Sequence, residues 1–148
     1  MAIYLAGRYG RREELCGYRA ELVAAGIEVT ANWLDGPAQR HIDGTVLTPT
    51  EEQLVEIGAD TPETVAISGK CAWQDVDDVL NATTLVAFTE HPASLNRGRG
   101  GRHVEYGMAI AAGIEVIVCG WREHIFHSLP QVIHFATWPE VFAYLTGT

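Results

Sequence analysis

Short runs of continuously apolar residues alternate with longer stretches of helical periodicity along this chain, and this alternation restricts its fold more than any other feature. Five runs are predicted to be strands, at 2–6, 27–31, 84–89, 115–119 and 133–136. Strands that are apolar throughout are typical of a sheet covered on both faces. The stretches between them are long enough for right-handed crossovers between parallel strands.

Helix signals occupy the intervals between these strands. The segment Thr48-Pro49-Thr50-Glu51 is a capping box with proline at the first helical position, which predicts a short helix over 49–58. Thr61-Pro62 begins a longer helix that ends near 82. Further helices are expected at 11–25, 102–112 and 138–146, and a loop at 35–48. We therefore predict an α/β fold: a flavodoxin-like (Rossmann-like), doubly wound sheet of five parallel strands with helices on both faces.

Length and charge limit the organisation of the chain and its partners. A chain of 148 residues suits one domain, 1–148. Ten lysines and arginines against 19 acidic residues give a net charge of −9, which argues against polymeric nucleic acid or an anionic membrane as a partner. No apolar run has the length of a membrane span. Three widely spaced cysteines suggest reduced thiols and a cytoplasmic location.

Two arginine-rich, glycine-rich loops follow predicted strands. Ligands of doubly wound sheets bind beyond the carboxyl ends of the strands, which places the expected site at 7–12, 32–35, 89–102 and 120–124. Six of the ten cations lie in two of these segments: Arg8, Arg11, Arg12, Arg97, Arg99 and Arg102. Neither loop has the P-loop pattern or the dinucleotide fingerprint. They predict a site for a small anion such as one phosphate, with plain surface arginines as the alternative.

Glu105 is the strongest candidate for a catalytic group. It lies near the start of a predicted helix and off the apolar face that Val104 and Met108 form. The helix N-terminus and nearby arginines are expected to favour its ionised form. A positioned carboxylate can attack a sugar carbon. The alternative is an ordinary glutamate placed for the helix dipole.

A second acidic group precedes the third strand. Asp75, Asp77 and Asp78 are close in sequence, and the first and last share a helix face. Three acids so close repel one another, which is useful in a functional site and tolerable on a solvated helix face, the alternative. Tyr9 and Trp33, both at strand ends, could stack on a planar ring.

The histidines give little evidence for a metal site. His124 and His127 are three residues apart, but no third ligand follows at a supporting spacing. We expect no metal and no cofactor.

Several motifs together resemble the nucleoside 2-deoxyribosyltransferases and the related deoxynucleoside 5'-monophosphate N-hydrolases and cytidylate N-glycosidases. The resemblance covers about residues 3–119. The motifs are Ile3-Tyr4-Leu5-Ala6-Gly7, Asp75-x-Asp77-x5-Thr83, Gly101-x3-Glu105-x-Gly107-x-Ala109 and Gly113-Ile114-Glu115-Val116.

The resemblance implies a catalytic mechanism and a partner. Glu105 would attack the anomeric carbon and release the base, leaving a glycosyl-enzyme, while Asp75 would assist the leaving base. The substrate would be a small nucleoside or nucleotide, and the protein a homodimer or higher homo-oligomer. The substrate-binding residues are expected to be Tyr4, Gly7, Arg8, Tyr9, Arg11, Trp33, Asp77, Arg97, Gly101 and Arg102.

The chain departs from the family pattern in places that affect the predicted activity. Ala82-Thr83 stands where the family usually has Ala-Asp, and 35–69 aligns with nothing. The loop before Glu105 is longer and more basic than in plain deoxyribosyltransferases, and resembles the monophosphate hydrolases more closely. We expect cleavage of the N-glycosidic bond of a 2'-deoxynucleoside or its 5'-monophosphate, with transfer to another base or to water. A strict monophosphate N-hydrolase and a non-catalytic nucleotide-binding module are the alternatives.

Overall fold

The computed structural model describes residues 1–39, 43–58 and 60–148, and its centre is one five-stranded sheet. All strand pairs are parallel, in the order β2-β1-β3-β4-β5. This order is that of the flavodoxin-like fold and confirms the predicted fold. The strands are β1 (Ala2–Ala6), β2 (Glu28–Val29), β3 (Thr84–Phe88), β4 (Glu115–Cys119) and β5 (Ile133–Phe135).

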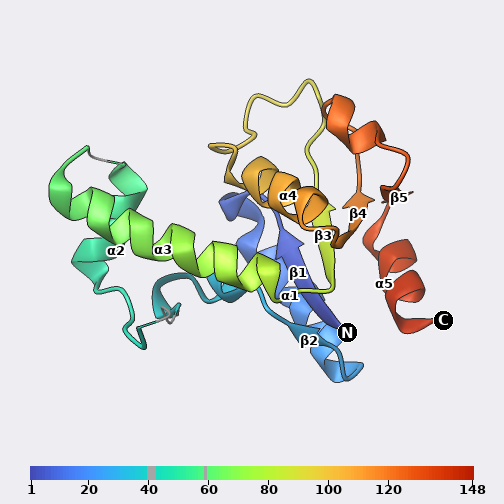
Figure 1. Cartoon of the computed structure of the whole chain (residues 1–148), viewed down its shortest axis with the longest axis horizontal. Helices are drawn as coiled ribbons and strands as arrows, with labels where there is room; N and C mark the ends of the chain where they lie inside the picture. Colours follow the sequence, from blue (N-terminus) through green and yellow to red (C-terminus); the bar gives the residue numbers. More distant parts are fainter. Residues whose placement is uncertain (40–42, 59) are drawn as a thin grey trace.

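Helices cover both faces of the sheet (Figure 1). On one face α3 and α4 pack against each other. On the other face Tyr18 of α1 stacks on Trp138 of α5, with ring centroids 4.4 Å apart. The helices are α1 (Arg12–Ala24), α2 (Pro49–Ile57), α3 (Pro62–Leu80), α4 (Gly101–Ala111) and α5 (Trp138–Thr146), with 3-10 turns η1 (Tyr9–Arg11), η2 (Asn32–Ala38) and η3 (Ile125–Ser128).

Many expected boundaries differ from the structure by one or two residues, and two regions need comment. The strand expected at 27–31 contains only Glu28–Val29, because β2 lies at the sheet edge and pairs with β1 alone. The region 35–48, expected to be a loop, begins with the last residues of η2. The part of that expected loop at 40–42 lies outside the described residues.

The central strands β1 and β3 form the core of the sheet. Every residue of both strands is buried, and their register pairs Leu5 with Val86. The chain leaves β1 toward β2 and leaves β3 in the opposite direction toward β4. The carboxyl ends of β1 and β3 therefore flank the crevice in which doubly wound sheets bind ligands.

The structure also bears on the membrane prediction. Across 1–39, 43–58 and 60–148, no helix has both the length and the apolar character needed to cross a bilayer.

Candidate functional site

A cavity of about 600 Å³ lies at the carboxyl ends of β1 and β3. Its walls come from the β1–α1 loop, η2, α2, α3 and the loop that leads into α4. Most of the residues proposed from the sequence line it: Gly7, Arg8, Tyr9, Trp33, Asp75, Arg97, Gly101, Arg102 and Glu105. Segments far apart in the sequence thus meet at one site.

Glu105 projects into this cavity from the second turn of α4. Burial, and then the negative charge of the nearby Asp75, raise the pKa of Glu105 to about 8 against a lowering contribution from the Tyr4 hydroxyl. The raised pKa differs in direction from the expectation of a carboxylate kept ionised by the helix terminus and by arginines. The helix begins at Gly101, so Glu105 lies beyond the first turn, where the dipole acts most strongly.

Asp75 reaches the same cavity from α3. Burial, and then the negative charge of Asp78, raise the pKa of Asp75 to about 7. Its Oδ1 atom is buried and has no hydrogen-bond partner among the described residues. Two carboxyl groups that both titrate near neutrality can hold and exchange a proton inside the cavity.

Asp78, one helical turn from Asp75, has a structural role. Its carboxylate accepts hydrogen bonds from the backbone N–H of Asn32 (3.0 Å), the side chain of Asn32 (2.9 Å) and the side chain of Gln74 (2.7 Å). These bonds attach η2 to α3 and place the two walls of the cavity opposite each other. Asp78 affects the cavity through its charge.

Three proposed substrate-binding residues do not line the cavity. Tyr4 is fully buried in β1, below Glu105, and its hydroxyl makes no hydrogen bond to any other described residue within normal distance. Arg11 points toward the opposite face of the sheet, where it lines a smaller hollow. Asp77 is exposed on α3. Tyr4 can act only from beneath the site, and the structure does not bring Arg11 or Asp77 to it.

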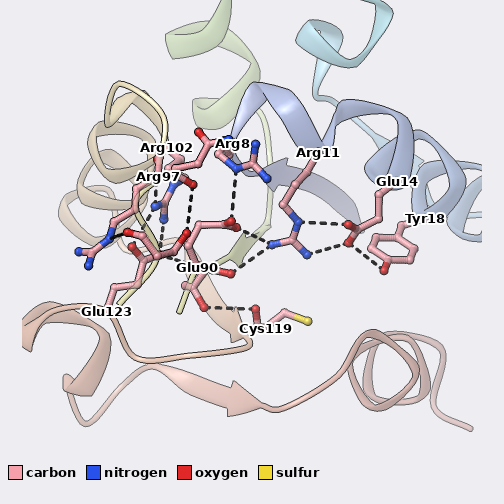
Figure 2. Close-up of polar contacts among 12 residues, drawn as sticks. Arg8, Arg11, Glu14, Tyr18, Glu90, Arg97, Arg102, Cys119 and Glu123 are labelled. Carbon is pink, nitrogen blue, oxygen red and sulfur yellow. Dashed lines mark hydrogen bonds and ion pairs between the residues drawn. The ribbon is translucent and has the colours of Figure 1, made fainter. Parts of the chain in front are cut away.

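Several arginines form ion pairs with Glu90 and Glu123, two residues that the sequence analysis did not propose for the site (Figure 2). Glu90 accepts from Arg8 Nε at 3.2 Å and from Arg11 Nη1 at 2.9 Å. Glu123 accepts from both terminal nitrogens of Arg102, and both side chains are buried. The positive charges of Arg8, Arg11 and Arg102 are balanced by these two glutamates, which explains why the arginines do not lower the pKa of Glu105.

Arg97 and Arg99 are the cations most available to a ligand. Both are exposed at the cavity, and no acidic side chain in the described part of the chain pairs with either. Arg97 Nε donates to the Ser94 carbonyl at 2.7 Å, and Arg99 Nη2 to the Glu56 carbonyl at 2.6 Å. These bonds leave other guanidinium N–H groups for an anion.

Glycines allow the arginine-bearing loop to approach the β1–α1 loop. Gly98 and Gly100 have φ of +74° and +90°, a conformation that side chains disfavour. A Cβ at Gly98 would lie 3.2 Å from Cγ of Arg8. The backbone conformation and the close contact between the two basic loops therefore favour glycine at this position.

Aromatic rings form one wall of the cavity. The Trp33 indole N–H donates to the Leu5 carbonyl at 2.9 Å, which fixes the ring at the end of β1. The exposed Tyr9 ring lies 6.2 Å from it, centroid to centroid, and is inclined at 42°. This wall suits a planar ligand.

The sequence analysis missed the contribution of α2 and its neighbours to the cavity. These residues are Gln39, Leu47, Glu52, Val55, Glu56 and Cys71. The capping box located α2 correctly, with both of its reciprocal hydrogen bonds present. Nothing local in the sequence shows which surface such a helix covers.

Tertiary structure adds a third histidine to the pair noted in the sequence. His103 Nδ1 lies 3.2 Å from His124 Nε2. The His124 and His127 rings stack at 3.7 Å, however, and His127 Nδ1 accepts the backbone N–H of Glu123 at 3.0 Å. Metal ligands must direct free lone pairs at one point. One ring nitrogen from each of the three histidines lies within 4.8 Å of the other two, and the buried Nδ1 of His124 has no hydrogen-bond partner among the described residues.

Comparison with known proteins supports the fold. No protein-family model matches the chain, and neither does any curated protein sequence. The solved structure of the CMP N-glycosidase BcmB from Clostridium botulinum is similar, with a TM-score of 0.55 over 100% of both chains. The two sequences are 18% identical. At this identity the likeness shows a shared fold over the whole length.

Proposed function

We propose that this protein cleaves the N-glycosidic bond of a nucleoside 5'-monophosphate through a covalent intermediate on Glu105. One observation carries the proposal: Glu105 and Asp75, two carboxyl groups titrating near neutrality, share a cavity with Arg97 and Arg99, which pair with no acidic side chain among the described residues. The resemblance of the sequence motifs and the fold shared with a CMP N-glycosidase support the same chemistry.

The proposed reaction has two steps with balanced proton transfers. The Glu105 carboxylate attacks the anomeric carbon while the C–N bond breaks, and the bonding electrons leave with the base, which takes a proton from Asp75. Water then attacks the same carbon and gives its proton to Asp75, and the bond to Glu105 breaks. Two displacements at one carbon retain its configuration.

The proton shared by the two carboxyls sets the reactive form. The reaction requires Glu105 ionised and Asp75 protonated, whereas the pKa of Glu105, about 8, lies above that of Asp75, about 7, so the proton must move from Glu105 to Asp75 when the substrate binds. The Tyr4 hydroxyl reduces this difference because it lowers the pKa of Glu105. The positive charge that develops on the sugar ring stabilises the Glu105 carboxylate further. Asp75 Oδ1 lacks a hydrogen-bond partner among the described residues, so it is the atom that would hydrogen-bond to the leaving base and protonate it.

The arginine-bearing loop suits a single phosphate. Arg97 and Arg99 present charged N–H donors, and Arg8 lines the same cavity from the β1–α1 loop. A phosphate dianion offers several acceptors to such donors. The chain is acidic overall, which favours a small anion held by a local basic cluster over a nucleic-acid strand.

A substrate screen tests the proposal. The protein is incubated with each ribo- and deoxynucleoside and with each 5'-monophosphate, with and without a second free base, and released base is followed by chromatography. We expect base release from a 5'-monophosphate in water alone. Release that requires the acceptor base would identify a deoxyribosyltransferase instead.

A non-catalytic nucleotide-binding module is the competing function, and the raised pKa of Glu105 is the observation that favours it. A carboxyl that stays protonated in the complex cannot attack the sugar. Calorimetric binding of a monophosphate without release of base from any substrate would establish this alternative and overturn the proposed activity.

A further inference from the structure

Glu123, four residues beyond the end of β4, joins Arg102 and Glu90 in one polar network (Figure 2). Its side chain is 3% exposed. One carboxylate oxygen accepts from Arg102 Nη1 and from the backbone N–H of Glu90 at 2.7 Å, and the other accepts from Arg102 Nη2 at 2.9 Å. One side chain thus connects β4, the end of β3 and the first turn of α4.

The network continues from Glu123 to both basic loops. Arg102 Nη2 also donates to the Arg97 carbonyl at 3.2 Å, which holds the backbone of the arginine-bearing loop. Glu90, whose N–H Glu123 accepts, binds Arg8 and Arg11 through its own carboxylate. The placement of the cations at the cavity therefore depends on one buried carboxylate that does not itself line the cavity.

The arginine-bearing loop needs such an anchor. Arg97 and Arg99 are exposed, and the glycines at 98 and 100 give the backbone extra conformational freedom. Ordering a loop for an anion costs conformational entropy, and an anchored loop has lost that entropy before the ligand arrives. Glu105, by contrast, is fixed by α4 itself, which packs on α3 and β3.

We propose that Glu123 is a positioning residue: through Arg102 it holds the arginine-bearing loop in the conformation that binds the phosphate of the substrate. The identity of the bound phosphate rests on the proposed function. The anchoring of the loop by Glu123 does not depend on it. Removing the anchor raises KM for a 5'-monophosphate and changes kcat little, because the loop binds the phosphate and the two carboxyls perform the chemistry.

The test uses two variants and one matched control. Glu123→Gln removes the charge but leaves Arg102 buried without its partner, which lowers stability. The double variant Arg102→Met/Glu123→Leu removes both charges, a replacement that is often neutral for stability. Glu115→Gln is the control, because Glu115 also joins two elements, through Thr84 and Tyr144, but lies at the opposite end of the strands.

Limited trypsin digestion measures the anchoring without any activity. We expect cleavage after Arg97 and Arg99 to be faster by about tenfold or more in both Glu123 variants, since cleavage requires local opening of the loop. The Glu115 control should be cleaved at the rate of the unmodified protein. Unchanged cleavage in the double variant, folded by circular dichroism, overturns the anchoring role.

Steady-state kinetics measures the consequence for the substrate. We expect KM for the 5'-monophosphate to rise by about tenfold, with kcat and the KM of the matching nucleoside within about threefold. Equal changes for nucleotide and nucleoside overturn the link to the phosphate. Absence of turnover in the unmodified protein rejects the proposed function alone, because the trypsin result still decides the anchoring.

Discussion

At the scale of the residue, Asp75 and Asp78 show how surroundings separate two chemically identical groups. Asp78 accepts hydrogen bonds from Asn32 and Gln74, whereas Asp75 keeps a buried oxygen that has no partner among the described residues. A buried polar atom without a hydrogen bond lowers stability. Such atoms are retained where a ligand supplies the missing bond, and Asp75 therefore suits contact with the leaving base.

Glu105→Gln should abolish turnover and leave the fold intact. The amide cannot act as the nucleophile, so we expect kcat to fall by more than about 10³-fold. The melting temperature should stay equal or rise. The buried amide carries no charge, so it avoids the cost of burying a carboxylate, which is the cost that raises the pKa of Glu105. The measurements are base release and a thermal melt, with Glu115→Gln as the control. Residual activity near that of the unmodified protein would contradict the assignment of the nucleophile.

The two raised pKa values predict a specific pH dependence of stability. The folded protein keeps its protons on Asp75 to about pH 7 and on Glu105 to about pH 8, whereas the unfolded chain loses them near pH 4. Between these values the folded state binds more protons, so the free energy of unfolding falls as the pH rises. The titratable groups that shift the pKa of Glu105 are Tyr4 from β1 and the two aspartates of α3, Asp75 and Asp78.

Thermal melts from about pH 5 to pH 8 check this sign. The melting temperature of the unmodified protein should fall over this range more than that of Glu105→Gln or Asp75→Asn. Parallel curves for all three proteins would show that neither carboxyl has the raised pKa.

At the scale of the element, α4 brings anchoring and chemistry together. Its first turn carries Arg102, which binds Glu123, and its second turn carries Glu105. The N-cap residue is Gly100, which has no side chain to cap the helix. Its φ of +90°, which glycine adopts readily, lets the chain turn sharply from the basic loop into the helix. The conformation of this loop and the position of the nucleophile therefore depend on the same helix start.

Gly98→Ala tests the conformation of the basic loop. With φ at +74°, alanine is strained by roughly 1 kcal/mol or more, and its Cβ would lie 3.2 Å from Cγ of Arg8. We expect weaker binding of a 5'-monophosphate by calorimetry and little change in the affinity for the nucleoside.

Gly69→Ala is the matched control for this substitution. Gly69 lies on the exposed side of α3, and an added Cβ meets no atom within 4 Å. Alanine in a helix interior should stabilise the protein slightly and leave nucleotide affinity unchanged. Equal losses of affinity in the two variants would show that the loop conformation is not specific to phosphate binding.

At the scale of the whole molecule, the cations available to a ligand and the exposed apolar side chains belong to different segments. The net charge is −9, yet the cations without acidic partners in the described part of the chain include two at the cavity, Arg97 and Arg99. Trp121, Ile125 and Phe126, at and before η3, are exposed by 55%, 79% and 58%. Adjacent exposed apolar side chains are typical of protein contact sites.

We expect the protein to form a homodimer or higher homo-oligomer, as the sequence resemblance implies, with this apolar surface in the contact. Light scattering coupled to size exclusion should give at least twice the chain mass of 16.2 kDa. Phe126→Glu should shift the population toward the monomer, and Val46→Glu, at another exposed apolar position outside this surface, should not. A monomeric unmodified protein at micromolar concentration would contradict the expectation.

The sequence by itself determined the order of elements, the fold and the two candidate carboxyls, because periodicity, capping residues and the alternation of apolar runs are local signals. It also placed most cavity-lining residues at the ends of strands, where the fold class requires them. Only the tertiary structure decided that Glu90 pairs with Arg8 and Arg11, that Glu123 pairs with Arg102, and that burial raises the pKa of Glu105. Ion pairing and burial arise from residues distant in sequence, so no local pattern records them.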